Sequence, residues 1–217
     1  MAQLQPELLL QAYAIGVFPM AEGRDDPRLF FVDPDKRGII PLDRFHIPRR
    51  LRKTVRQRRF EVVCDRNFEA TLDSCAASTE RRPDTWINPE IRRLYLALHT
   101  RGHAHSIECW CDGVLVGGLY GVKLGGAFFG ESMFSRTTDA SKVALVHLVA
   151  RLRVGGFTLL DSQFITDHLQ RFGAEEIPRE IYRGLLEQAI ATPAQFDSAA
   201  DDWPSVVSLL QDSTQTS

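Results

Sequence analysis

The 217-residue sequence contains no apolar run approaching the ~20 residues that a membrane helix requires. Its beginning, MAQLQPELLLQAYAIG, lacks the basic region and the small-residue cleavage site of a secretory signal peptide. It has only four cysteines, which do not make a disulfide framework in a chain of this length. We therefore expect a cytoplasmic, monomeric protein that folds around an apolar core and does not bind membranes.

Two of the cysteines, Cys109 and Cys111, form a C-x-C pair. No second close pair, and no Cys/His pair at finger spacing, completes a tetrahedral zinc site around them. Their spacing fits two small apolar side chains on one face of a strand. The sequence therefore predicts no metal site.

The basic residues are unevenly distributed. Hydrophobic residues make up 44% and charged residues 25% of the chain, which is typical of a globular protein, and the net charge is only −2. The segment from Arg44 to Phe60 nevertheless holds eight Arg or Lys residues and no acid, whereas the rest of the chain holds 18 basic and 28 acidic residues. A basic surface on an otherwise acidic protein favours a polyanionic partner that binds at one place.

The first sixty residues predict a helix, a short strand and a basic helix. Pro6 can open a helix that ends near Gly16, and residues 29–32 form an apolar strand candidate before Asp33-Pro34. Pro48 opens the basic helix. Four of its cations recur at i, i+3, i+4 and i+7 and so form one stripe: Arg49, Arg52, Lys53 and Arg56. Leu51 and Val55 would hold another face of this helix to the body of the protein.

Helices and strands alternate through the remaining sequence. The expected elements are a strand at 60–64, a helix after Asn67, a helix at 88–102, a hairpin of 106–111 and 114–122 around Asp112-Gly113, a strand at 127–134, a helix from Asp139 to 155, a strand at 157–164, a short helix from Thr166 to 173, and a helix at 178–190. The expected N-cap residues of four of these helices are Asn67, Asn88, Asp139 and Thr166. This order predicts an α+β fold with a mixed sheet, and it fits the acyltransferase fold called GNAT.

We expect three parts in the chain. Residues 1–60 would form a small N-terminal α/β lobe with the basic helix, 61–192 the GNAT-like catalytic domain, and 193–217 a polar and loose C-terminal tail.

Several segments together carry a family resemblance. They are YAIGVFPM near the start, HAHSIE-x-W from His103, VGG-x-YGV from Val116, F-x-GESMFSR from Phe128, ASK-x-AL from Ala140, D-x-Q from Asp161 and DH-x(4)-GA-x-EIPR from Asp167. In this order and spacing the chain resembles the leucyl/phenylalanyl-tRNA–protein transferases from about Leu8 to Ile190.

The resemblance implies an enzyme with a GNAT-like domain that needs neither a metal nor acyl-CoA. Such an enzyme moves Leu or Phe, and also Met, from Leu-tRNA or Phe-tRNA to the N-terminal α-amine of proteins that begin with Arg or Lys. That transfer marks the acceptor protein for N-end-rule degradation. The aminoacyl-tRNA is the donor substrate, and the resemblance implies no cofactor.

Asp161 and Gln163 are the candidate catalytic pair. They are two residues apart on a predicted strand and therefore share one face. The resemblance implies that Asp161 polarises Gln163, whose amide oxygen orients or accepts from the attacking amine. The ester is already activated and a free α-amine has a reference pKa of ~8, so a modest base and good positioning suffice. A hydrogen-bonded structural pair at a strand end is the alternative.

Glu131 lies in a segment rich in Phe and Met, where a carboxylate is costly unless it is paired. The resemblance implies that Glu131 binds the N-terminal Arg or Lys of the acceptor. The alternative is a structural ion pair with Arg136.

The resemblance also assigns three groups of residues to the aminoacyl-tRNA. Trp110, which shares a strand face with Glu108, would stack on the 3′-terminal adenosine, and core packing is its alternative role. Phe30 or Phe31 would also stack there, because Phe30-Phe31 stands where the family usually has a Trp-Trp pair. The aminoacyl side-chain pocket would be lined by apolar residues that could equally be core: Leu119, Phe128, Met133, Leu148 and Leu160. The tRNA phosphates would meet the basic helix, through Arg49, Arg50, Arg52, Lys53 and Arg56, whose alternative role is a solvated face.

Other functions match less of the sequence. An acetyl-CoA-dependent N-acetyltransferase needs a phosphate-binding R/Q-x-x-G-x-G/A loop before a helix, and the segment from Gln170 has Glu175 in the last place. A serine hydrolase needs G-x-S-x-G, which fails at Phe134. A non-catalytic tRNA-binding protein remains the alternative from another class.

Overall fold

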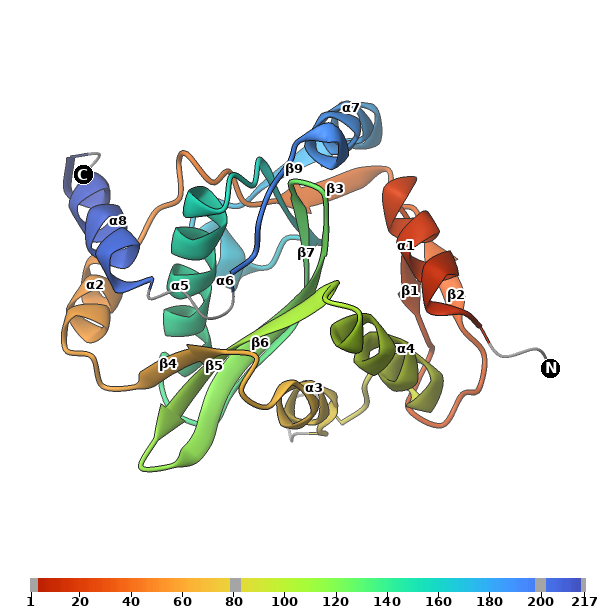
Figure 1. Cartoon of the computed structure of the whole chain (residues 1–217), viewed down its shortest axis with the longest axis horizontal. Helices are drawn as coiled ribbons and strands as arrows, with labels where there is room; N and C mark the ends of the chain where they lie inside the picture. Colours follow the sequence, from red (N-terminus) through yellow and green to blue (C-terminus); the bar gives the residue numbers. More distant parts are fainter. Residues whose placement is uncertain (1–3, 79–82, 198–201, 216–217) are drawn as a thin grey trace.

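The computed structural model describes residues 4–78, 83–197 and 202–215 (Figure 1). A seven-stranded sheet of order β4-β5-β6-β7-β8-β3-β9 runs through it, and β1 and β2 form a separate two-stranded sheet. The strands are β1 (Phe18–Met20), β2 (Phe30–Val32), β3 (Lys36–Ile39), β4 (Glu61–Cys64), β5 (Ala104–Cys111), β6 (Val114–Leu124), β7 (Ala127–Ser135), β8 (Leu159–Gln163) and β9 (Glu175–Pro178).

The helices cover both faces of the large sheet. They are α1 (Pro6–Ala14), α2 (Arg49–Arg56), α3 (Phe68–Ala76), α4 (Pro89–Thr100), α5 (Ala140–Val154), α6 (Asp167–Gln170), α7 (Arg179–Ala191) and α8 (Trp203–Gln215). One apolar core joins the sheet to α2, α5 and α8, and a second joins it to α1, α3, α4 and α7. Among the described helices, none is both long and apolar enough to span a membrane.

The strands β7 and β8 run parallel to each other but pair only over a short distance. Their register runs from Ala127 opposite Leu159 to Phe129 opposite Asp161. Beyond that point β7 continues beside β6 as far as Ser135, which lies opposite Gly117, while β8 ends at Gln163. The two strands therefore part at their carboxyl ends, the kind of place where open sheets bind ligands.

The predicted α+β architecture with a mixed sheet is confirmed. Three strands were not predicted: β1, β3 and β9. β3 and β9, with the sequences KRGI and EEIP, lack the alternation of apolar and polar residues that identifies a strand. The division of the chain at residue 60 stays a prediction; β3, from the first sixty residues, lies between β8 and β9 in the large sheet.

The helix starts follow the expected capping chemistry with one exception. The side chains of Asn67, Asn88 and Thr166 accept main-chain N–H groups in the first turns of α3, α4 and α6. Asp139 precedes α5 in the left-handed conformation, with φ +69°, and its side chain makes no capping bond. Its carboxylate instead accepts Lys142 Nζ at 2.7 Å, so the predicted Asp139 cap is wrong.

The expectation of a loose segment after Ala191 is also wrong for the residues of α8. Val206, Leu209 and Leu210 are buried in the core that contains α5. Just before this helix, Asp202 accepts His147 Nδ1 of α5 at 3.0 Å. The i, i+3, i+4 spacing of the three apolar residues is the signal that could have identified this helix.

Candidate active site

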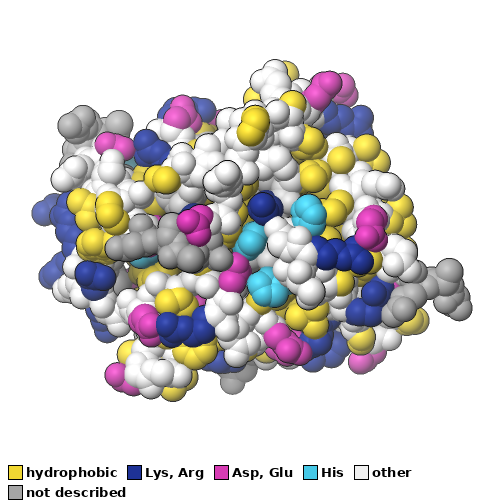
Figure 2. Space-filling view, in the orientation of Figure 1, with side chains coloured by type: hydrophobic (Ala, Val, Ile, Leu, Met, Phe, Trp, Pro, Cys, Tyr) yellow, Lys and Arg dark blue, Asp and Glu magenta, His cyan; other side chains and the backbone are white. Residues whose placement is uncertain are grey.

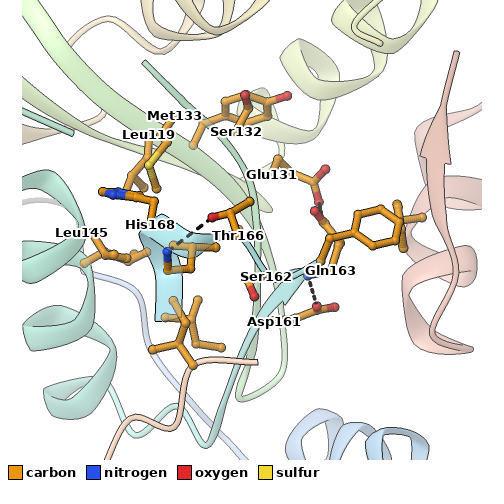
Figure 3. A pocket seen from close by; sticks show the side chains of 18 of the residues that line it. Leu119, Glu131, Ser132, Met133, Leu145, Asp161, Ser162, Gln163, Thr166 and His168 are labelled. Carbon is orange, nitrogen blue, oxygen red and sulfur yellow. Dashed lines mark hydrogen bonds between the residues drawn. The ribbon is translucent and has the colours of Figure 1, made fainter. Parts of the chain in front are cut away.

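A cavity of about 410 Å³ opens where β7 and β8 part, and its two ends differ in chemistry (Figure 3). One end is mainly apolar, lined by Ile40, Leu119, Met133, Leu145, Leu148 and Leu160, with His168 beside them. The other end carries Glu131, Asp161 and Gln163. The volume lies within the range of small-molecule sites, so a single amino-acid side chain fits beside a group of polar residues.

Asp161 is fully buried and its carboxylate is saturated with donors. Arg37 donates through Nε to Oδ1 at 3.0 Å and through Nη2 to Oδ2 at 2.7 Å. Tyr182 OH donates to Oδ2 at 2.7 Å. Arg37 itself is 1% exposed and lies between the rings of Phe18 and Tyr182, 4.4 and 4.6 Å from their centroids. The Asp161 charge is therefore compensated by a bidentate, desolvated guanidinium.

The contact between Asp161 and Gln163 runs through the main chain. Asp161 Oδ1 accepts the Gln163 backbone N–H at 2.7 Å (Figure 3). This turn ends β8 and leaves Gln163 in the left-handed region, with φ +60°. A non-glycine residue there costs of order 1–3 kcal/mol, and such strain clusters at functional sites. The simple alternation of strand faces thus ends before Gln163, although both residues reach the cavity as predicted.

Glu131 enters the cavity from a β-bulge. Gly121 of β6 lies opposite Gly130 and Tyr120 lies opposite Ser132, so Glu131 is the extra residue on β7. Bulges of this kind re-aim a side chain next to a site. The Glu131 carboxyl group accepts Gln163 Nε2 at 2.9 Å on Oε1.

Two tyrosines from the N-terminal half complete the surroundings of Glu131. Tyr13 OH donates to Oε1 at 2.7 Å, and Tyr95 OH donates to Oε2 at 2.8 Å. Burial raises the pKa of Glu131 to about 7, although these two hydrogen bonds and Arg37 act to lower it. Arg136 is not its partner: that side chain donates to Leu115 O and to Ser74 Oγ.

Four polar residues of this site were not identified from the sequence: Arg37, Tyr182, Tyr13 and Tyr95. Tyr13 begins the YAIGVFPM segment that carries part of the resemblance, so a signal for it existed. Arg37 lies in the unpredicted strand β3, 124 residues before Asp161. Sequence spacing alone has no means of joining partners so far apart.

Most of the residues predicted to hold the aminoacyl side chain line the cavity. Leu119, Met133, Leu148 and Leu160 do so, and Leu145 joins them from the same face of α5. Phe128 does not. It is fully buried among core aromatic rings, 6.4 Å from the Phe157 ring and 5.6 Å from the Phe196 ring.

The aromatic residues predicted to meet the adenosine lie outside this cavity. Trp110 is half-buried, and its Nε1 donates to Glu108 at 2.9 Å, which confirms that the two share a face. Phe30 and Phe31 are 43% and 39% exposed on β2. Phe30 pairs with Met20 and Phe31 pairs with Pro19, and both of these β1 residues line the cavity. Phe31 lines an open groove with Arg24 and Arg28.

The basic helix α2 presents most, but not all, of its predicted cations to solvent. Arg49, Arg50, Lys53 and Arg56 are exposed, whereas Arg52 is 7% exposed. Leu51 and Val55 pack inward as expected. Figure 2 shows Lys and Arg side chains gathered along the edge of the molecule where Figure 1 places α2.

Neither a metal centre nor a coenzyme A loop is evident in the part of the chain that the structure describes. No group of three or more His, Cys, Asp or Glu side chains among these residues is placed to hold a metal ion. The segment from Gln170 to Glu175 runs from the last residue of α6 to the first residue of the strand β9, and not into the helix that a pyrophosphate loop precedes.

Comparison with known proteins identifies close relatives. The family model described as leucyl/phenylalanyl-tRNA protein transferase matches residues 39–187, and that of its N-terminal domain matches residues 2–35. Proteins named leucyl/phenylalanyl-tRNA–protein transferase are 60% identical in Paramagnetospirillum magneticum (92% of this chain, 96% of the relative) and in Maricaulis maris (97% of each). Among solved structures, FemX aligns with a TM-score of 0.51 and 14% identity over 84% of this chain and 71% of FemX, which is a likeness of fold alone.

Proposed function

This chain belongs to the leucyl/phenylalanyl-tRNA–protein transferase family, and we propose that it transfers leucine or phenylalanine, and also methionine, from aminoacyl-tRNA to the N-terminal α-amine of proteins. The observation that supports this most directly is the two-ended cavity at the parting of β7 and β8. The apolar end suits an acyl donor with an apolar side chain. The polar end, with two carboxyl groups and an amide, suits an amine acceptor.

The donor side chain occupies the apolar end, between the leucines of α5 and Met133. A methylene group in such a pocket is worth only ~1–3 kcal/mol, so Leu, Phe and Met are accepted together. The aminoacyl-tRNA is the activated donor, and we assign the reaction no cofactor. The domain that holds this cavity is a GNAT-like acyltransferase fold, and the protein acts in the cytoplasm.

The chemical step joins the acceptor nitrogen to the ester carbonyl carbon and releases the 3′-oxygen of the tRNA, to which the proton of the amine finally passes. Gln163 donates its side-chain N–H to Glu131, which leaves its amide oxygen to accept a hydrogen bond from the attacking amine. Asp161, through the Gln163 main chain, holds that residue in its left-handed conformation. Positioning of an activated ester beside an amine supplies most of the acceleration.

The acceptor begins with Arg or Lys, and Glu131 binds the cationic side chain. This role is supported by the position of Glu131 in the cavity and by the absence of an ion pair between Glu131 and any described Lys or Arg. The product then carries an N-terminal Leu or Phe that marks it for N-end-rule degradation.

The tRNA lies along α2 and reaches the aromatic residues outside the cavity. Trp110 and one of the two exposed β2 phenylalanines, Phe30 or Phe31, stack on the terminal adenosine. The exposed cations of α2 meet phosphates, and the buried Arg52 does not. Replacing Arg49, Lys53 and Arg56 with Ala should flatten the salt dependence of tRNA affinity, since each phosphate contact contributes ~0.9 to the slope.

The transfer assay mixes the purified protein with labelled Leu-tRNA and a peptide that begins with Arg, without acetyl-CoA. Label in the peptide supports the proposal, whereas label only when acetyl-CoA is present indicates an N-acetyltransferase. Asp161→Asn, which keeps the size of the side chain and an oxygen acceptor for Arg37, should lose turnover while it still binds charged tRNA. Asp167→Asn is the matched control, because Asp167 is exposed and lies outside the cavity. Equal affinity for charged and uncharged tRNA with no transfer would identify a binding protein instead.

A further inference from the structure

The carboxyl group of Glu131 and the hydroxyls of Tyr13 and Tyr95 form a closed ring that contains four oxygen atoms. The Tyr13 hydroxyl lies 2.7 Å from Glu131 Oε1, the Tyr95 hydroxyl lies 2.8 Å from Oε2, and the two hydroxyls lie 2.8 Å from each other. Each of these three contacts has the length of an O–H···O hydrogen bond and needs one proton. Each tyrosine supplies one proton, so the two hydroxyls satisfy only two of the three contacts.

A proton on Glu131 completes the hydrogen bonding of this ring. In that form Oε2–H donates to Tyr95, Tyr95 donates to Tyr13, and Tyr13 donates to Oε1, which also accepts Gln163 Nε2. An ionised Glu131 leaves one pair of oxygens in contact at under 3 Å without a proton between them. A polar group that is removed from water without its hydrogen bond costs of order 1–3 kcal/mol, so the ring with the extra proton is the more stable arrangement.

None of the other titratable or charged side chains around Glu131 supplies it with a cation of its own. Tyr13 approaches Glu131 from α1, Tyr95 from α4, Asp161 from β8 and Arg37 from β3. Tyr120 of β6 and His168 of α6 line the same cavity, and burial lowers the pKa of His168. The guanidinium of Arg37 is bound to Asp161 and to Gly16 O, and Tyr182 of α7 donates to Asp161. The Arg37–Asp161 pair is neutral as a unit, so an ionised Glu131 is a carboxylate without a counter-ion of its own.

We propose that the free protein holds Glu131 in its protonated form, with the proton closing the ring to Tyr13 and Tyr95, and that the cationic side chain of the acceptor displaces this proton when it binds. The exchange is balanced: a carboxylic acid and an incoming cation give a carboxylate–cation pair and one proton released to water. This inference rests on the proposed role of Glu131 in binding an N-terminal Arg or Lys. It makes the preference for a cationic acceptor depend on pH.

The pH dependence is measured as a ratio of two acceptors. One peptide begins with Arg and the other with citrulline, which has nearly the same shape and no charge. Both carry the same α-amine, so titration of the attacking nitrogen cancels in the ratio of their kcat/KM values. Below the midpoint, the ratio should rise about tenfold per pH unit, because one proton leaves as the cation binds. It should level off above about pH 7.

The ring variants distinguish this exchange from a merely structural role of the tyrosines. In the closed ring Tyr95 accepts the Glu131 proton and does not donate to the carboxyl group. Tyr13→Phe and Tyr95→Phe each open this ring, so each should move the midpoint of the ratio to lower pH. Tyr182→Phe removes the same hydroxyl from the Asp161 side of the cavity and should leave the midpoint in place. Glu131→Gln should give a low ratio that does not change with pH.

Proton release is measured directly by titration calorimetry in two buffers of different ionisation enthalpy. At pH 6 the binding of the Arg peptide should release about one proton more than the binding of the citrulline peptide. At pH 8.5 the two peptides should release equal numbers of protons. A ratio near one at every pH overturns the acceptor role of Glu131 itself. A clear preference for Arg that neither changes with pH nor releases a proton overturns the proton exchange and leaves the acceptor role standing.

Discussion

Two carboxyl groups reach the same cavity from neighbouring strands, and their surroundings are opposite. Asp161 on β8 meets a bidentate guanidinium, a tyrosine hydroxyl and a main-chain N–H. Glu131 on β7 meets two tyrosine hydroxyls and a side-chain amide, all of them neutral. Asp161 is compensated by a permanent cation, whereas Glu131 is compensated either by a proton or by a cation that arrives from outside.

The comparison shows how one cavity separates two tasks. Asp161 fixes the positions of its neighbours, because permanent donors already occupy its carboxylate oxygens. The uncompensated Glu131 is the group that can respond to a charged ligand. Gln163 joins the two, through its main-chain N–H to Asp161 and its side-chain N–H to Glu131. Carboxyl groups whose environments differ in this way commonly take different roles in one site.

The largest effect on the free energy of unfolding is expected when Arg37, the permanent cation beside Asp161, is removed. Arg37→Leu leaves Asp161 buried without a counter-charge, which should cost ~3–5 kcal/mol of unfolding free energy. Urea denaturation of the purified variant measures it. The double variant Arg37→Leu/Asp161→Leu should regain most of the stability and none of the transfer activity. A loss of unfolding free energy below ~1 kcal/mol in the single variant would show that the ion pair is not what distinguishes the surroundings of Asp161 from those of Glu131.

The next effect concerns the pH dependence of stability. Folding raises the pKa of Glu131 from 4.5 to about 7, so its protonated form stabilises the fold below pH 4.5 and this contribution is lost as the pH rises through 7. Relative to Glu131→Gln, the wild-type protein should lose ~2–3 kcal/mol of unfolding free energy between pH 4.5 and pH 7.5. Urea midpoints of both proteins across this range measure the difference. Parallel curves would contradict it.

A matched pair of tyrosines tests the two environments with the same chemical change. Tyr182→Phe removes a hydrogen bond to a charged carboxylate, and Tyr13→Phe removes one from the ring around Glu131. At pH 5.5 the first should cost about 1 kcal/mol more than the second, since hydrogen bonds to charged groups are the stronger ones. Thermal or urea unfolding of both variants gives the comparison. Equal losses would indicate that both carboxyl groups carry the same charge.

The sequence predicted those features of the fold and of the site that local patterns encode. The D-x-Q spacing, the capping residues Asn67 and Asn88, and the Asp112-Gly113 hairpin each depend on neighbours within a few residues. The partners of the two carboxyl groups did not follow from such patterns. Tyr13 reaches Glu131 across 118 residues of sequence, and no local spacing predicts that contact.

The β-bulge explains a further difference between expectation and structure. Strand alternation assigns faces correctly only while the register is regular, and Glu131 interrupts the register of β7. Phe128, on the regular side of the bulge, points into the core, while Met133 on the other side lines the cavity. The apolar segment that contains both gives no sign of the extra residue. Leu145 was overlooked because it lies in an unbroken apolar run, residues 143–146, that does not indicate which member faces the cavity.

The smallest expected effect on stability is at the residue between the two carboxyl groups. Gln163→Gly relieves the left-handed strain at φ +60° but increases the freedom of the unfolded chain, and it removes the hydrogen bond to Glu131. These terms nearly cancel, so the unfolding free energy should change by less than ~1 kcal/mol while transfer is abolished. Gln163→Ala keeps the strain, loses the same amide and should be the less stable of the two variants. If Gln163→Gly is instead strongly destabilised, the bond that links the two carboxyl groups contributes more than the strain costs, and the cavity depends on Gln163 for its fold as well as for its chemistry.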